Sequence, residues 1–390
     1  MVEFGKQKDL EIKIKQTLEM LKHEKKPNTR IILYNYIGNL YSALTVVSGK
    51  RMYPSKQKVF GTIGNFRKFM RKIDQYTKEN LENFVFYKDF HQDYFNDVLL
   101  ISEENFVTHL NEETAKYRAK ADRLSEKEFL AIFHDFCSSL GLEKEYNEIV
   151  RNKRLFYMIR GKAYDNYLGL TTHHPLTGES NIFIDHFQYD FESLFTLVHE
   201  LGHYYDLKEF ASRDTVREFS DYTFKSLYQE VVSRMFERLF LVFLIKNRIL
   251  LDQAIDKLID VELVNHDYMF SAYSFSLLDD DLLLSRKYLD LSREDIYQEL
   301  LGYFDCKQDT FCELVGNPEN FMEAVVYSYG DIVSMFLKEA VAAEGLNSPF
   351  MKTFQKERTK EFNNHFMLDE GLDSSKYGEL FKKEIQLIKK

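Results

Sequence analysis

The 390-residue chain has few of the residues that interrupt helices or form covalent crosslinks. It contains 5 prolines and 16 glycines, well below the usual shares of about 5% and 7%. Because helix breakers are scarce, the sequence favours long helices. Its 3 cysteines are an odd number without a CxxC pair, which argues against a disulfide framework and a cysteine-based zinc site. We therefore expect a cytoplasmic protein that folds in a reducing compartment.

The sequence also lacks a long apolar segment and an excess of positive charge. Its longest uninterrupted apolar run, residues 239–245, is far shorter than the ~20 residues of a membrane-spanning helix. Charges interrupt the apolar stretches at the N-terminus, so we expect no secretory signal. Lysine and arginine number 52, aspartate and glutamate number 62, and the net charge of −10 repels phosphate backbones and anionic lipids. Nucleic acids and membranes are therefore not the expected partners.

Hydrophobic periodicity predicts a mainly α fold with a small β element. Apolar residues recur at helical spacing in several segments, among them residues 10–21, 129–136 and 222–251. The clearest exception is a loop predicted over residues 171–180, rich in turn-forming residues, followed by a short edge strand predicted over residues 181–187. This strand directly precedes the segment that carries the main motif.

Residues 191–205, FESLFTLVHELGHYY, carry an HExxH motif on a predicted helix, with Asp190 as its N-cap. His199 and His203 lie one turn apart on the same face, so both can bind one metal ion. Glu200 is rotated by about 100° from His199, which lets it hold a water molecule at the metal without binding the metal itself. The motif indicates a zinc site; the alternative is two histidines packed on a buried helix.

A catalytic zinc site needs three protein ligands and an open position for water. The next predicted helical stretch, residues 227–239, offers Glu230, Ser233 and Glu237 on one face. We predict Glu230 as the third ligand and Glu237 as the group that orients a zinc-bound imidazole through its other ring nitrogen. The alternative, that both glutamates lie on a solvated face, conflicts with the apolar residues that surround them in the sequence.

At these residues the chain resembles the oligoendopeptidase F and thimet oligopeptidase family of zinc metallopeptidases. The resemblance rests on the runs NIFIDHFQYDFESLFTLVHELGH, QEVVSRMFE and AVVYSYGDIVS, which fall within residues 160–336, under half of the chain. It implies one zinc ion per chain, held by His199, His203 and Glu230. It also implies that Glu200 is the general base and that the Tyr329 hydroxyl supports the tetrahedral intermediate.

The chain departs from the pattern of this family at two places. Asp206 stands where the family usually has a further histidine, and the stretch NPENFMEA lacks clear counterparts of an upstream histidine and tyrosine. Four further residues have no role that the sequence decides. His173 and His174 could face the cleft or lie in a surface loop, and Asp206 and His266 stay unassigned.

We therefore expect a zinc metalloendopeptidase that cleaves short, unstructured oligopeptides by means of Glu200 and a water molecule at the zinc. One alternative is a carboxypeptidase or dipeptidase with the same metal site. Another is a protein that binds metal and peptide without catalysis. We expect a helical N-terminal region over residues 1–155 that covers the cleft and a catalytic region over residues 156–390, unless the two form one continuous domain. The sequence does not indicate an oligomeric state.

Overall fold

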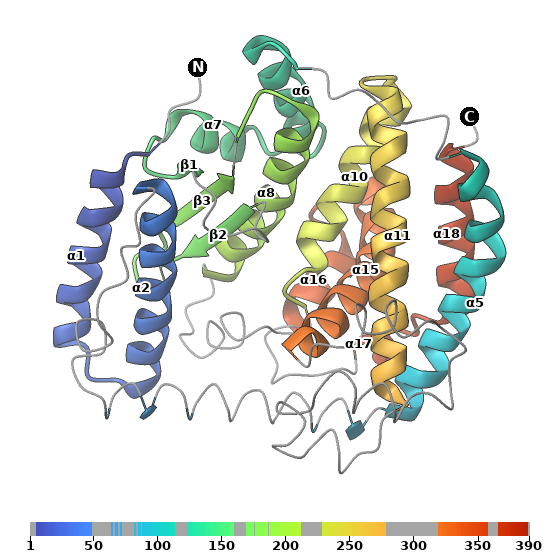
Figure 1. The fold of residues 1–390 in the computed structure, drawn as a ribbon, viewed down its shortest axis with the longest axis horizontal. Helices are drawn as coiled ribbons and strands as arrows, with labels where there is room; N and C mark the ends of the chain where they lie inside the picture. The colour runs from blue at the N-terminus through green and yellow to red at the C-terminus, as the bar shows by residue number, and fades with distance from the viewer. Residues whose placement is uncertain are drawn as a thin grey trace. The chain divides into compact units, whose positions relative to one another are not determined.

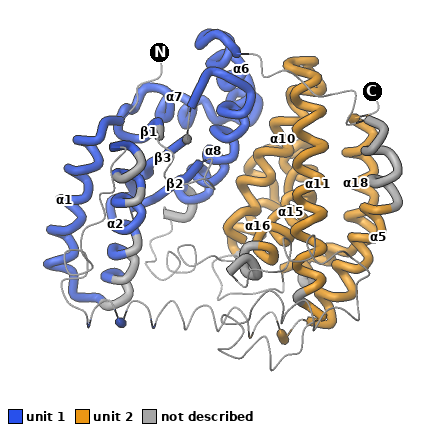
Figure 2. The backbone as a smooth tube through the Cα atoms, in the orientation of Figure 1, with its two compact units in different colours: residues 1–74, 121–224 blue, residues 75–120, 225–390 orange. Residues whose placement is uncertain are grey.

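The computed structural model describes residues 5–48, 64, 67–68, 71, 82, 85–86, 88–113, 123–159, 169–174, 176–185, 187–211, 228–277, 319–357 and 366–388. Among these residues helices predominate and three short strands form one sheet (Figure 1), which confirms the predicted mainly α fold. None of the described helices is long and apolar enough to cross a membrane. The chain divides into two compact units, each built from two separate stretches of sequence (Figure 2).

The first unit combines residues 1–74 with residues 121–224 and contains the HExxH motif. The predicted boundary between residues 155 and 156 lies inside this unit. Because compactness does not reveal which region carries an activity, the predicted division into a covering and a catalytic region stays a prediction. The described elements of the unit are α1 (Gln7–His23), α2 (Pro27–Ser48), α6 (Glu126–Ser139), α7 (Glu143–Arg151), β1 (Phe156–Ile159), β2 (Gly169–His173), β3 (Ser180–Asp185) and α8 (Phe191–Ala211).

The three strands form one sheet in the order β1–β3–β2. β3 runs parallel to β1, with Phe156 opposite Ile182, and antiparallel to β2, with Leu170 opposite Phe183. The predicted strand is confirmed, but its predicted place at the sheet edge is wrong, because β3 lies between the other two strands. The loop predicted over residues 171–180 is also shorter than expected, since its first three residues belong to β2.

Alternate residues of β3 face opposite sides of the sheet. Phe183 belongs to an apolar cluster with Leu10 of α1 and Leu40 of α2. Ile182 and Ile184, which are 0% and 1% exposed, face the other side. α8 packs against β2 and β3 (Figure 1). The sheet therefore holds the helix of the HExxH motif beside strand β2.

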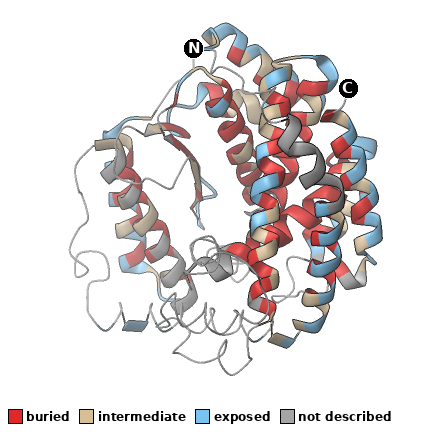
Figure 3. Cartoon of the chain, turned by 45° about the vertical axis from the view of Figure 1, so that its right-hand side comes forward, coloured by how far each residue is buried: buried red, intermediate tan, exposed pale blue. Residues whose placement is uncertain are grey.

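The second unit combines residues 75–120 with residues 225–390 and is a helical bundle in its described part. α15 packs against α10, α11 and α18, while α5 packs against α11 and α18. Buried residues run along these helices where they face one another (Figure 3). The described elements are α5 (Lys88–Glu113), α10 (Val231–Asn247), α11 (Leu251–Ser276), α15 (Glu319–Glu344), α16 (Pro349–Glu357), α17 (Phe366–Asp369) and α18 (Ser374–Ile388).

α10 is surrounded by protein along most of its length. Every residue from Val231 to Leu241 is buried. Glu230, directly before the helix, and Glu237 within it are only 5% and 4% exposed, so the alternative that they lie on a solvated face is wrong. Charged side chains buried to this degree have to be paired or to bind a cation, because removing them from water is costly.

Candidate metal centre

Helix α8, which carries both predicted histidine ligands, begins at a side-chain cap. The backbone N–H of Ser193 donates to Oδ1 of Asp190 at 2.9 Å, and that of Leu194 donates to the Asp190 carbonyl at 3.1 Å. A carboxylate here satisfies an N–H group of the first turn and offsets the positive end of the helix dipole. Asp190 is therefore the N-cap that the sequence predicts.

His199 and His203 share one face of α8, as their spacing of four residues requires. Their Nε2 atoms lie 3.1 Å apart and their ring planes are inclined by 78°. Two nitrogen ligands, each 2.0–2.1 Å from a tetrahedral zinc ion, lie about 3.3 Å from each other. The two imidazoles therefore hold the geometry of two ligands of a single metal ion.

Glu200 is 2% exposed, and strand β2 supplies two features of its surroundings. The Thr171 hydroxyl donates to Oε2 of Glu200 at 2.5 Å. Gly169 leaves space for the other carboxylate oxygen, because a Cβ atom at Gly169 would lie 2.3 Å from Oε1. Neither residue was predicted from the sequence: Thr171 was expected in a loop, and Gly169 precedes that loop.

Glu230, the predicted third ligand, immediately precedes α10 and is held from two sides within the second unit. The Ser233 hydroxyl lies 3.0 Å from the Glu230 carbonyl oxygen and 3.1 Å from its Oε2, so it can donate to either. A Cβ atom at Gly330 of α15 would lie 3.0 Å from Cβ of Glu230. A glycine at this position lets α15 approach the backbone that carries Glu230.

Glu237, predicted to orient an imidazole, accepts a hydrogen bond from Nη1 of Arg234 at 3.0 Å. The Arg234 guanidinium lies 5.0 Å from the centre of the Tyr327 ring, within the range of a cation–π contact. The Tyr327 ring stacks on Tyr268 with centroids 4.7 Å apart. Arg234 is a third residue without a prediction from the sequence, although a basic residue in an apolar helix was a signal for it.

Tyr329 and Tyr327 point in different directions from α15, as two residues of a helix separated by about 200° should. Tyr329 is 1% exposed, and its hydroxyl lies 2.7 Å from Nδ1 of His91 on α5. Burial lowers the pKa of His91 to about 3, so this imidazole is neutral and its tautomer decides which of the two groups donates in the contact. The predicted role of Tyr329 at the reacting carbonyl stays a prediction. In the structure its hydroxyl contacts His91.

The remaining polar residues of the prediction lie in two different settings. Nδ1 of His173 is 2.7 Å from the Ser180 hydroxyl, and Nδ1 of His174 accepts the backbone N–H groups of the following turn at 3.2 Å. These contacts favour a structural role for both histidines in the β2–β3 connection. Asp206 is buried in α8 and His266 is half-buried in α11, and neither has an assigned role.

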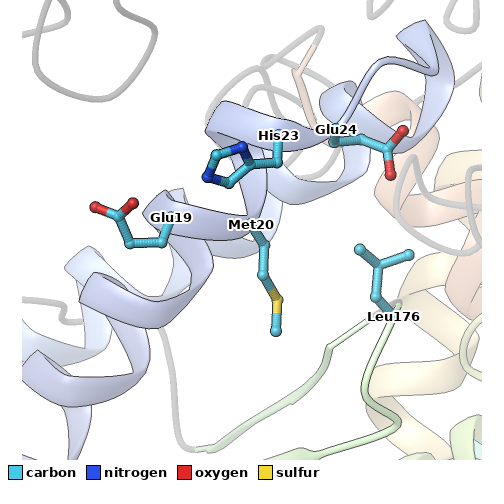
Figure 4. A pocket seen from close by; sticks show the side chains of 5 residues that line it. All are labelled: Glu19, Met20, His23, Glu24 and Leu176. Atoms are coloured by element: carbon cyan, nitrogen blue, oxygen red, sulfur yellow. The ribbon is translucent and has the colours of Figure 1, made fainter.

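A hollow of about 450 Å³ lies near the end of α1 (Figure 4). Its lining is part acidic and part apolar, and it includes none of the predicted catalytic or metal-binding residues. The hollow is therefore a separate feature from the candidate metal centre. The residues that line it are Glu19, Met20, His23, Glu24 and Leu176.

The donor set of His199, His203 and Glu230 is one that could hold a metal ion. Each residue offers one ligand atom, a ring nitrogen or a carboxylate oxygen. Two imidazoles and one carboxylate form a set of ligands that suits zinc and leaves a fourth position open. The chemistry of these side chains therefore fits the cofactor that the sequence predicts.

No protein-family model matches the sequence, and no curated protein matches it either. Among solved structures, the chain is similar to a "putative peptidase" from Chlamydophila abortus, with a TM-score of 0.46 and 12% sequence identity. The aligned region covers 93% of this chain and 62% of that chain, so this chain spans less than two thirds of that protein's length. A likeness at this level does not assign the chain to a family. Its resemblance to the oligoendopeptidase F family stays a prediction from the sequence.

Proposed function

We propose that the chain is a zinc metalloendopeptidase that hydrolyses short, unstructured oligopeptides. The observation that carries this proposal is the pair of Nε2 atoms of His199 and His203, 3.1 Å apart on the helix that also carries the buried Glu200. Glu230 completes a donor set of two histidines and one glutamate, which is the set found in many zinc peptidases. The buried carboxylate between the two histidines in sequence supplies the general base.

The zinc ion and three side chains would each serve one part of peptide hydrolysis. Bound zinc would lower the pKa of water to about 7 and polarise the scissile carbonyl. Glu200 would accept the proton of the attacking water and then deliver it to the leaving amine. Tyr329 would donate a hydrogen bond to the developing oxyanion, and Glu237 would orient a ligating imidazole.

An extended peptide is the substrate that suits the sheet of the first unit. Strand β2 lies at one end of the strand order and carries Thr171, which contacts the proposed general base. We infer that a substrate strand pairs with β2 and not with the central β3. Pairing through the backbone gives affinity with little side-chain selectivity, so broad specificity is expected.

The test is hydrolysis of an internally quenched peptide that is blocked at both ends, with product masses as the second readout. Metal-replete protein should cleave it internally, a chelator should abolish cleavage, and added zinc should restore it. Cleavage only of peptides with a free end would replace the proposal with an exopeptidase. Zinc binding without cleavage of any peptide would replace it with a non-catalytic metal- and peptide-binding protein.

A further inference from the structure

Strand β2 presents Thr171 and Gly169 to Glu200 from one face, because residues two apart in a strand point the same way. The Thr171 hydroxyl lies 2.5 Å from Oε2 of Glu200 and 3.3 Å from the Glu200 backbone carbonyl oxygen. A hydroxyl has a single hydrogen, so it favours one of the two acceptors. The shorter contact, and the stronger hydrogen bonds that carboxylates accept, assign that hydrogen to the side chain.

Gly169 acts on the other oxygen of the same carboxylate by leaving space. A Cβ atom at this position would lie 2.3 Å from Oε1 and 2.9 Å from both Cδ and Cγ of Glu200. Its φ angle is not in the left-handed region, so alanine would suit the backbone, and the three atoms nearest to its Cβ would all belong to the Glu200 side chain. The carboxylate therefore occupies volume that any larger residue at 169 would fill.

Resting on the proposed function, we propose that Thr171 and Gly169 are positioning residues that set the orientation of the Glu200 carboxylate. Thr171 holds Oε2 by a hydrogen bond, and the missing side chain of Gly169 leaves space for Oε1. The carboxylate of the general base is therefore oriented before the substrate binds. Glu200 lies on α8 and both residues lie on β2, two elements that pack against each other. A misplacement of about 1 Å can cost about 100-fold in rate, which is why the orientation matters.

The experiment compares Thr171→Val, Thr171→Ser and Gly169→Ala with a matched control, Thr172→Val. Thr172 is the next residue on β2, is 4% exposed, and uses its hydroxyl to accept from Asn181 at 3.2 Å on the other face of the strand. Loss of the Thr171 hydroxyl should lower kcat by about 10- to 100-fold with KM and bound zinc unchanged. Thr171→Ser should restore most of kcat, and Thr172→Val should leave it unchanged.

Crystal structures of the same variants report the carboxylate position without any assay of activity. The Glu200 carboxylate should rotate away from its wild-type position in Thr171→Val and Gly169→Ala, and keep it in Thr171→Ser and Thr172→Val. An unmoved carboxylate in Thr171→Val and Gly169→Ala overturns the positioning role. Wild-type protein that binds zinc but cleaves no peptide overturns the proposed function instead. An equal loss of kcat in the Thr171 and Thr172 valine variants would reduce Thr171 to a structural residue of the strand.

Discussion

Glu200 in the first unit and Asp331 in the second are both buried carboxylates, yet they are held in opposite ways. A neutral hydroxyl, that of Thr171, contacts Glu200. Asp331 accepts two hydrogen bonds from the guanidinium of Arg238, with Nε at 3.2 Å and Nη2 at 2.5 Å. Both bonds reach the same oxygen, Oδ1, and they fix the position of the Asp331 carboxylate, while burial raises its pKa. A general base has to take up a proton, and a carboxylate held by a neutral hydroxyl can do so without losing an ion pair.

The network around Asp331 ties four helices of the second unit together. Arg238 of α10 also donates to Glu262 of α11 at 2.5 Å and to Glu384 of α18 at 2.8 Å, and Lys338 of α15 donates to Glu384 at 3.1 Å. Among the buried groups joined by these hydrogen bonds, two cations face three carboxylates, which is one negative charge in excess. Burial raises the pKa of Glu262 to about 8, so a proton on this carboxyl neutralises the network near neutral pH.

Replacing the Glu200 carboxylate with an amide tests the proton exchange assigned to this residue. Glu200→Gln should lower kcat by about 10²- to 10⁴-fold, since the amide keeps the shape of the carboxylate but accepts no proton. Zinc content and the circular dichroism spectrum should match those of the wild type. Wild-type turnover in this variant would remove Glu200 from the role of general base and end its contrast with Asp331.

Arg238 should stabilise the second unit through the network around Asp331. Arg238→Met should lower the free energy of unfolding by about 3–5 kcal/mol, because the buried carboxyl groups of Asp331, Glu262 and Glu384 lose the guanidinium that they share. Urea unfolding measures this loss. The control is Lys22→Met, which removes an exposed surface pair with Glu19 and should leave stability nearly unchanged. Equal stability of the two variants would show that the network does not hold the bundle.

The third prediction asks whether the second unit contributes a hydroxyl to catalysis as well as a scaffold. If Tyr329 donates to the oxyanion, Tyr329→Phe should lower kcat by about 100-fold, roughly 3 kcal/mol, with little change in KM. Steady-state kinetics of Tyr327→Phe provide the comparison. A loss of kcat in Tyr327→Phe alone would assign the oxyanion contact to Tyr327 and not to Tyr329. A loss of stability without loss of kcat in Tyr329→Phe would make its bond to His91 purely structural.

Protonation of Glu262 predicts a small pH dependence of stability. The pKa of Glu262 is about 8 in the folded chain and near 4.5 when unfolded. At a pH between these two values, Glu262 is protonated in the folded state and ionised in the unfolded state. The free energy of unfolding therefore falls as pH rises from about 4.5 to 8. Between pH 5.5 and pH 8.5, the free energy of unfolding measured with urea should fall less for Glu262→Gln than for the wild type. The same pH dependence of stability in both proteins would contradict a protonated Glu262 in the folded state.

Local features of the sequence predicted helix α8 and the burial of Glu230 well. The spacing of His199 and His203, the cap at Asp190 and the apolar surroundings of Glu230 all depend on residues within a few turns of one helix. The missed features are contacts between distant segments. Thr171 meets Glu200 across 29 residues, and Arg238 meets Asp331 across 93. No period or motif encodes such pairs, because packing of separate elements brings them together.

Elemental analysis of metal-replete protein shows whether His199, His203 and Glu230 bind one zinc ion. The wild type should hold one zinc per chain, and Glu230→Gln should lose it. Glu237→Gln should keep the site with an affinity about 10- to 100-fold weaker, as expected when a partner of a ligand is removed. Wild-type protein without zinc, or full occupancy in Glu230→Gln with loss in Glu237→Gln, would contradict the assignment.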